Sequence, residues 1–152
     1  SYERGFDVWL KLRSGPDCVG CERIDSVKRL TIRENSKETP NTNPSIEKLE
    51  VLGTLQAGQK VQLRVQTDPP EAYTDPSSGQ ARVEDYLLSW YTSSGEASPT
   101  RTFGSDRETD FVLPNEPGEV TVIVTLRDGR GGLAVERRTL CVGSGRLCSP
   151  PQ

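Results

Sequence analysis

The sequence contains no histidine and no methionine among its 152 residues. Without histidine, the chain cannot form Ser–His or Cys–His catalytic arrangements or histidine-ligated metal centres. Without methionine, the chain is expected to be a processed or excised piece of a longer protein. Only 32% of the residues are hydrophobic and 6% are aromatic. No apolar run approaches the roughly 20 residues that a membrane-spanning helix needs, so we expect no such segment.

An excess of positive charge is also missing. The chain has 19 basic and 22 acidic residues, a net charge of −3. General binding to nucleic acid or to an anionic membrane requires a basic face, so neither is expected. Turn-forming residues are abundant instead, with 14 Gly and 11 Pro. This composition favours many short elements joined by turns.

The elements are predicted to be strands, because apolar residues alternate with polar ones while helical periodicity is weak. In residues 120–127, Val120, Val122, Val124 and Leu126 share one face. Seven further runs, and a short strand around Thr102-Phe103, complete the pattern: 6–12, 27–33, 46–52, 59–67, 86–90, 109–113 and 133–142. Seven of these strands lie in residues 45–142, and seven strands within about 100 residues are typical of an antiparallel β-sandwich.

Turn residues divide these runs into regions. Residues 128–132 predict a hairpin loop, and residues 67–82, with three prolines, predict a long irregular loop. Residues 36–44 contain no apolar residue and are interpreted as a linker. We therefore expect an N-terminal β-hairpin in residues 1–35, a sandwich in 45–142 and a C-terminal tail in 143–152. The hairpin either ends a preceding, similar domain or adds to the edge of the sandwich.

The four cysteines, Cys18, Cys21, Cys141 and Cys148, predict two disulfide bonds and an extracytoplasmic location. A tandem arrangement favours the local pairs Cys18–Cys21 and Cys141–Cys148, whereas a hairpin folded onto the sandwich allows a cross-bridge. A redox site is disfavoured because Cys18 and Cys21 are flanked by strands and loop. A zinc site is disfavoured because six residues separate Cys141 from Cys148.

Carboxylates gather in and around residues 67–85, where oxygen ligands could hold calcium. Their spacing matches no calcium loop, so a solvated acidic loop is expected, with Asp68, Asp75 and Asp85 as weak calcium candidates. Glycoside hydrolysis by a carboxylate pair is disfavoured because no apolar pocket is evident to shift a pKa. No cofactor is expected.

Aromatic side chains are the candidate ligand contacts. Trp90 is expected in the core, because it shares a strand face with Tyr86 and Leu88. Trp9 and Tyr91 lie on the opposite faces of their strands, and Tyr73 lies in the long loop. These three could stack on a sugar or contact another domain.

The segment from Pro117 to Gly132, with its alternating Val and Thr and its Asp-Gly-Arg-Gly-Gly ending, resembles the closing hairpin of bacterial PKD-like and related immunoglobulin-like domains. Residues 43–46 resemble the entry strand of that family, and residues 87–90 resemble its strand with a core tryptophan. The resemblance covers residues 43–142. It implies an immunoglobulin-like (PKD-like) antiparallel β-sandwich, here with an extra N-terminal β-hairpin, on a bacterial surface, in the periplasm or secreted.

The function expected from these features is non-enzymatic. The chain would be a structural or adhesive module of a bacterial cell-envelope or secreted protein, and it would bind another protein through loops or strand edges. The alternative is a carbohydrate-binding module of a larger secreted protein. An enzyme is disfavoured because histidine is missing and no catalytic motif converges.

Overall fold

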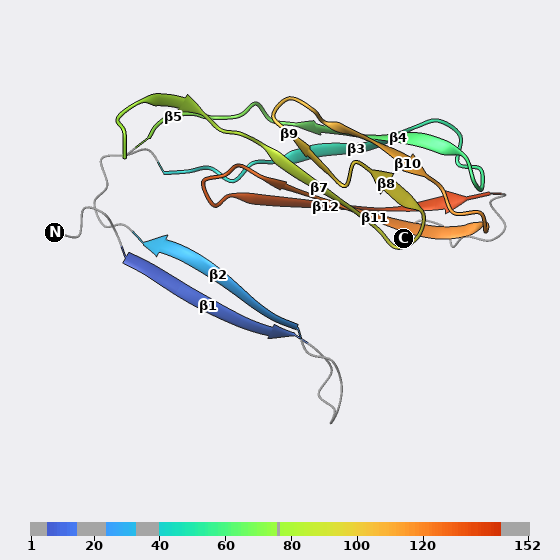
Figure 1. The fold of residues 1–152 in the computed structure, drawn as a ribbon, viewed down its shortest axis with the longest axis horizontal. Coiled ribbons are helices and arrows are strands. Elements are labelled where there is room, and N and C mark those ends of the chain that lie inside the picture. The colour runs from blue at the N-terminus through green and yellow to red at the C-terminus, as the bar shows by residue number, and fades with distance from the viewer. Residues whose placement is uncertain (1–5, 15–23, 33–39, 76, 144–152) are drawn as a thin grey trace. The chain divides into compact units, whose positions relative to one another are not determined.

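The structure, a computed structural model, describes residues 6–14, 24–32, 40–75 and 77–143 (Figure 1). Every regular element in these ranges is a β-strand, and every pair of strands is antiparallel. The all-β, antiparallel prediction is therefore confirmed. Within the described residues, no helix is long and apolar enough to cross a membrane. The chain divides into two units, Ser1–Pro40 and Asn41–Gln152.

The first unit is a hairpin of two nine-residue strands, β1 (Phe6–Ser14) and β2 (Ile24–Ile32). The register runs without interruption, from Phe6 opposite Ile32 to Ser14 opposite Ile24. Two antiparallel strands therefore pair within residues 6–32, as the alternation in this region predicts.

The second unit contains two four-stranded sheets and a two-stranded ribbon. The first sheet has the order β3-β4-β10-β8, with bounds Ile46–Leu52, Lys60–Thr67, Glu108–Val112 and Glu96–Ser98. The second sheet has the order β12-β11-β7-β9, with bounds Leu133–Val142, Gly118–Arg127, Leu87–Thr92 and Arg101–Phe103. The ribbon pairs β5 (Ala72–Thr74) with β6 (Ala81–Val83).

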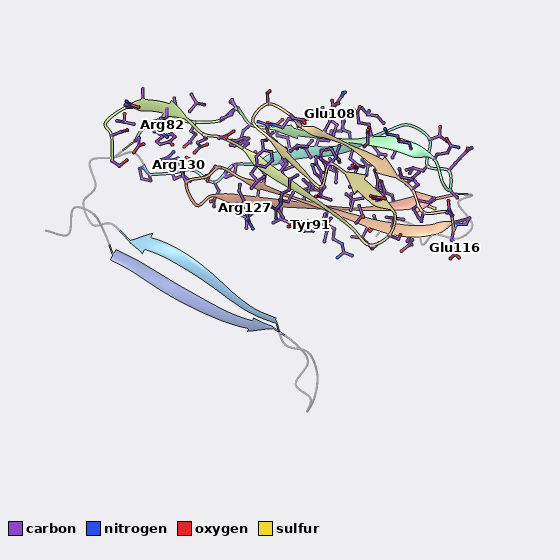
Figure 2. All side chains as sticks on the ribbon, in the orientation of Figure 1. Arg82, Tyr91, Glu108, Glu116, Arg127 and Arg130 are labelled. Carbon is purple, nitrogen blue, oxygen red and sulfur yellow. The ribbon has the colours of Figure 1, made fainter. Side chains whose placement is uncertain are left out.

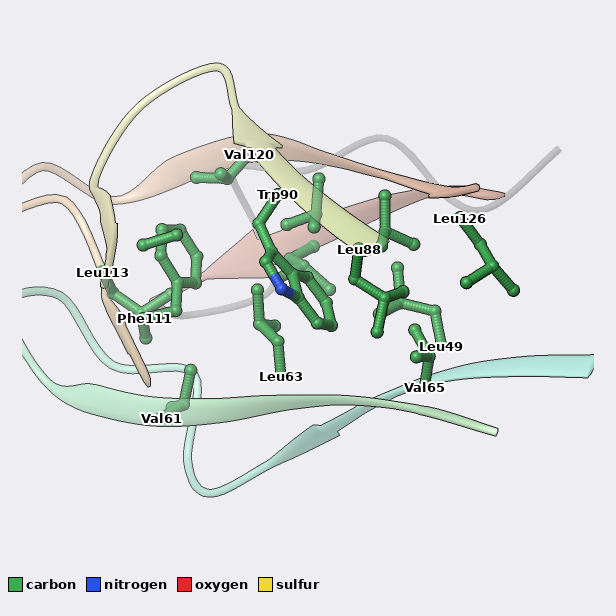
Figure 3. Close-up of a cluster of buried hydrophobic side chains, with 14 of the residues drawn as sticks. Leu49, Val61, Leu63, Val65, Leu88, Trp90, Phe111, Leu113, Val120 and Leu126 are labelled. Atoms are coloured by element: carbon green, nitrogen blue, oxygen red, sulfur yellow. The ribbon is translucent and has the colours of Figure 1, made fainter. Parts of the chain in front are cut away.

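The two sheets bury their apolar faces in one common core (Figure 3). The alternating residues of β11 and β4 supply much of it, and Leu88 and Trp90 of β7 lie among them. Each fully buried Val, Leu or Phe contributes about 1.5–3 kcal/mol relative to an exposed one. Trp90 is 2% exposed, and its indole Nε1 donates a hydrogen bond to Thr102 Oγ1 at 3.3 Å. The prediction that Tyr86, Leu88 and Trp90 face the core is confirmed.

Two connections contain strands that the sequence does not predict. Residues 67–82 are not wholly irregular, because β5 and β6 pair there across a turn at Gly79, whose φ is +69°. The polar connection of residues 93–105 contains β8 as well as the expected β9. β5, β6 and β8 are only three residues long, with mostly exposed side chains, so they have no alternating pattern to detect.

The second half of the predicted linker packs on the second unit. Pro44 is buried, and the amide of Ser45 donates a hydrogen bond to Asp68 Oδ1 at 2.9 Å. Asn41 Nδ2 donates to Asp128 Oδ2 at 2.6 Å. Residues 41–44 therefore pack as part of the sandwich unit.

Candidate functional site

A polar cluster surrounds Arg130, in the loop that joins β11 to β12 (Figure 2). Its Nη1 lies 3.1 Å from Glu84 Oε1 and 3.5 Å from Glu71 Oε2. Its guanidinium carbon lies 4.4 Å from the centroid of the Tyr73 ring, a cation–π contact. The Glu84 side chain is only 1% exposed, and its Oε2 accepts a hydrogen bond from the amide of Glu71 at 3.1 Å. Arg130 therefore neutralises a buried carboxylate.

A second buried carboxylate, Asp128, organises the same loop. Its Oδ1 accepts hydrogen bonds from the amides of Arg130 and Gly132, at 2.7 Å and 2.9 Å, and its Oδ2 accepts the bond from Asn41. Gly132 is required by space, because a Cβ there would lie 2.0 Å from Asp128 Oδ2 and 2.7 Å from Pro44 Cδ. The Asp-Gly-Arg-Gly-Gly run thus forms a hairpin loop closed by its own aspartate.

Tyr86 contacts the first residues of the loop formed by residues 67–82. Its side chain is buried, and its hydroxyl lies 3.4 Å from both Asp68 Oδ1 and the Pro69 carbonyl oxygen. Burial, together with the negative charges of Asp68 and Glu84, raises the pKa of Tyr86 to about 12. The Arg107 guanidinium lies 5.0 Å from the ring centroid.

Asp75 caps the turn between β5 and β6. Its Oδ1 accepts hydrogen bonds from the Ser77 hydroxyl at 2.7 Å and the Ser77 amide at 2.9 Å, and its Oδ2 lies 3.2 Å from Arg82 Nε. The hydrogen bonds from Ser77, followed by weaker effects of Ser78 and Arg82, lower the pKa of Asp75 to about 2. This carboxylate is used by the turn itself.

The sequence-predicted calcium candidates do not gather into one site. Asp68 contacts Ser45 and Tyr86, Asp75 contacts Ser77 and Arg82, and Asp85 is exposed. In the part of the chain that the structure describes, no group of three or more Cys, Asp or Glu side chains is placed to hold a metal ion. The buried carboxylates Glu84 and Asp128 each have both oxygens engaged, so neither presents a free oxygen for proton transfer.

The three candidate aromatic contacts differ in environment. Tyr91 is 52% exposed on β7 (Figure 2), as its strand face predicted. Tyr73 is half-buried beneath the Arg130 guanidinium, so that face of its ring is covered. The side chain of Trp9 lies outside the described residues. The structure therefore leaves Tyr91 as the exposed aromatic candidate of the second unit.

Among the cysteines, Cys141 lies in β12 and is disulfide-bonded. Cys18, Cys21 and Cys148 lie outside the described residues. The pairing of the four cysteines remains a prediction.

Large apolar side chains on the surface form the other feature of interest. They come from both sheets and the ribbon: Leu52, Val83, Tyr91, Phe103, Val112, Leu133 and Val135. Phe103 and Val135 are 60% and 57% exposed. Exposed aromatic and apolar groups of this size are typical of contact surfaces when they adjoin one another.

Sequence reasoning missed the Arg130–Glu84 pair and the role of Asp128. Asp128 had a local signal, since an aspartate before a glycine-rich turn commonly accepts hydrogen bonds from the amides that follow it. Glu84 had none, because its burial depends on a partner 46 positions away. In comparisons with known proteins, no family model matches the chain and no curated protein is significantly similar to it.

Proposed function

We propose that this chain is a non-enzymatic structural or adhesive module of a bacterial cell-envelope or secreted protein, and that it binds another protein through loops or strand edges. The observation that carries the proposal is the set of large apolar side chains left exposed by a sandwich whose core is complete without them. Side chains such as Tyr91 and Phe103 contribute nothing to that core, and aromatic residues are enriched in protein interfaces.

The buried polar groups support a structural role. Glu84, Asp128 and Tyr86 are held by partners within the fold, and these contacts fix the loops at one end of the unit. Stable loops on a rigid scaffold are the usual place for recognition in antiparallel sandwiches. The proposal also includes an immunoglobulin-like (PKD-like) topology, supported by the β11–β12 hairpin formed from residues 118–142.

The strand edges are not equally suited to pairing with a partner. On one side, Arg138 Nη1 donates a hydrogen bond to the Leu49 carbonyl oxygen at 2.6 Å, and the Gly143 amide donates to the Leu55 carbonyl oxygen at 2.7 Å. These bonds tie β12 to the β3 side of the sandwich. On the other side the edge strands, β8 and β9, have three residues each. Such edges resist strand addition, so loops and the side chains beside β9 are the favoured contacts.

The experiment compares protein and sugar binding by the purified chain. It would be immobilised, exposed to envelope and secreted fractions of the organism that encodes it, and tested in parallel on a glycan array. We expect saturable binding of a protein, reproducible with that protein purified, and no binding of sugars. Sugar binding that is lost in Tyr91→Ala but kept in the exposed control Leu52→Ala would establish the carbohydrate-binding alternative instead. Absence of any protein partner would overturn the proposal.

A further inference from the structure

The outward face of the β12-β11-β7-β9 sheet combines apolar side chains with arginines. Strand alternation identifies its members, because Val122, Val124 and Leu126 of β11 point into the core and their neighbours point outward. The register then aligns Tyr91 with Ile123 and Arg137, and Phe103 with Leu87, Arg127 and Leu133. We call its apolar and arginine members the arginine face: Leu87, Tyr91, Arg101, Phe103, Ile123, Arg127, Leu133, Val135 and Arg137. The other outward residues of these strands are Ser89, Glu119, Thr121, Thr125, Thr139 and Cys141.

Four apolar members of the arginine face are well exposed, whereas Leu87 and Ile123 are half-buried. Tyr91, Phe103, Leu133 and Val135 are 52%, 60%, 41% and 57% exposed. They occupy three successive outward positions along the strands and come from β7, β9 and β12. With about 4.8 Å between strands and about 6.8 Å between outward positions, the patch measures about 14 Å in each direction between backbones. Thr125 and Ser89 lie in the middle row, so the apolar side chains surround a polar centre. Exposed apolar side chains that gather on one face in this way are often part of an interaction surface.

The charge of the face is one-sided. Arg101, Arg127 and Arg137 are exposed, and none of them forms an ion pair in the part of the chain that the structure describes. The acidic outward residue of these strands is Glu119, four positions before Ile123 on β11. The outward face therefore has more positive than negative charges, although the whole chain has a net charge of −3. Figure 2 shows Arg127 and Tyr91 on one side of the sandwich and Glu108 on the other.

The outward face of the other sheet provides the contrast. Its basic residues are matched by neighbouring carboxylates, with Lys60 Nζ 2.6 Å from Asp110 Oδ2 and Arg64 paired with Glu108. Lys48 Nζ likewise lies 2.6 Å from Glu50 Oε1. These basic residues are paired within their own face, whereas Arg101, Arg127 and Arg137 of the arginine face have no ion pair among the described residues.

We propose that the arginine face docks an acidic polypeptide segment whose carboxylates alternate with apolar side chains. The inference rests on the proposed function, since it names the surface and the partner chemistry for protein binding. Arginine pairs with carboxylates through a planar fork. Two of the arginines lie beside apolar cross-strand neighbours, with Arg127 between Leu87 and Leu133 and Arg137 beside Ile123. A partner that offers only charge would leave the exposed Phe103 and Val135 in water, and nucleic acid is disfavoured by the net negative charge.

The test titrates the full chain with a short synthetic peptide that alternates Glu with Phe and Leu, and follows backbone amide shifts and binding affinity. We expect shifts at outward residues of β7, β9, β11 and β12. Arg127→Gln/Arg137→Gln should weaken binding about tenfold, the effect of losing two exposed ion pairs. Gln62→Glu/Gln66→Glu changes the net charge equally on the other sheet, and should alter the affinity less than twofold. Phe103→Ser should also weaken binding.

Several outcomes would overturn the inference. They are no binding, shifts confined to the β3-β4-β10-β8 sheet, equal binding of polyglutamate or of a single-stranded oligonucleotide, and concentration-dependent dimerisation that buries the face. If an envelope protein binds but is unaffected by Arg127→Gln/Arg137→Gln, the proposed function stands and this inference fails. If the peptide binds as expected while no envelope protein does, the inference about the arginine face stands and the proposed function fails.

Discussion

At the scale of single residues, the buried polar groups explain how the end of the sandwich near Arg130 is held together. Glu84 and Asp128 are buried, and each meets two or more donors. A buried carboxylate without such partners would be costly, whereas one that is fully hydrogen-bonded fixes the groups around it. These residues therefore act on loop geometry.

Asp128→Ala should destabilise the second unit by about 2–4 kcal/mol. The substitution leaves the amides of Arg130 and Gly132 and the Asn41 side-chain amide without their acceptor. Denaturant unfolding measures the loss. Asp106→Ala, at an exposed aspartate that accepts one bond from the Glu108 amide at 3.2 Å, is the control and should cost under about 1 kcal/mol. Equal losses in the two variants would contradict the structural role of Asp128.

Ser77→Ala should raise the pKa of Asp75 from about 2 towards its ordinary value of 3.8, because the Ser77 hydroxyl bond favours the charged carboxylate. The lowered pKa in the folded state means that Asp75 contributes stability above pH 3.8, and that this is lost as the pH falls towards 2. Carboxyl chemical shifts followed by NMR give the midpoint. A midpoint unchanged in Ser77→Ala would show that the hydroxyl has no such effect.

We predict that the raised pKa of Tyr86 lowers the free energy of unfolding at alkaline pH. Its pKa is raised to about 12, so the folded chain keeps the proton that an unfolded tyrosine releases from pH 10 upward. The contribution of protonated Tyr86 to the free energy of unfolding is complete below pH 10. It declines as the pH rises to 12, by up to about 1.4 kcal/mol per pH unit. Unfolding free energies measured across this range should show a shallower decline in Tyr86→Phe. Tyr91→Phe, at an exposed ring, is the control, and a shallower decline there as well would refute the assignment.

At the scale of elements, the long strands could be predicted from sequence, whereas three of the four three-residue strands could not. β4, β11 and β12 have eight to ten residues, enough for the alternation of valine and leucine with polar residues to be visible. β5, β6 and β8 exist because neighbouring strands or a turn hold them, and three residues carry no period. Among site residues, the exposure of Tyr91 followed from its strand face, whereas the Arg130–Glu84 pair depended on the tertiary fold.

Leu126→Ala tests which face of β11 is inside. Leu126 is 0% exposed, so the substitution should cost about 2–5 kcal/mol through lost burial and a residual cavity. Leu133→Ala makes the same change at a residue that is 41% exposed, across the hairpin on the outward face, and should cost under about 1 kcal/mol. Thermal or denaturant unfolding compares the two variants. A greater loss of unfolding free energy in Leu133→Ala than in Leu126→Ala would mean that the assignment of inward and outward faces is wrong.

At the scale of the whole molecule, the two units differ in how they can be stable. The second unit has a core drawn from both of its sheets, with described members from Leu49 to Val142. The described residues of the first, 6–14 and 24–32, form one pair of strands, and an isolated hairpin is marginal in water. A local disulfide within the hairpin loop would limit the unfolded states of that unit. The pairing of the cysteines therefore bears directly on whether the units are independent.

We predict that the disulfides are local to each unit, Cys18 with Cys21 and Cys141 with Cys148. The hairpin and the sandwich form separate units, and Cys141 is disulfide-bonded. A protease site inserted after Lys37 would divide the chain between them. Without reductant, local bridges release two fragments of separate mobility, and thiol titration of the denatured chain finds no free thiol. Fragments that separate only after reduction would mean that a cross-bridge joins the units, in which case the hairpin is covalently fixed to the sandwich and the tandem interpretation of residues 1–35 is wrong.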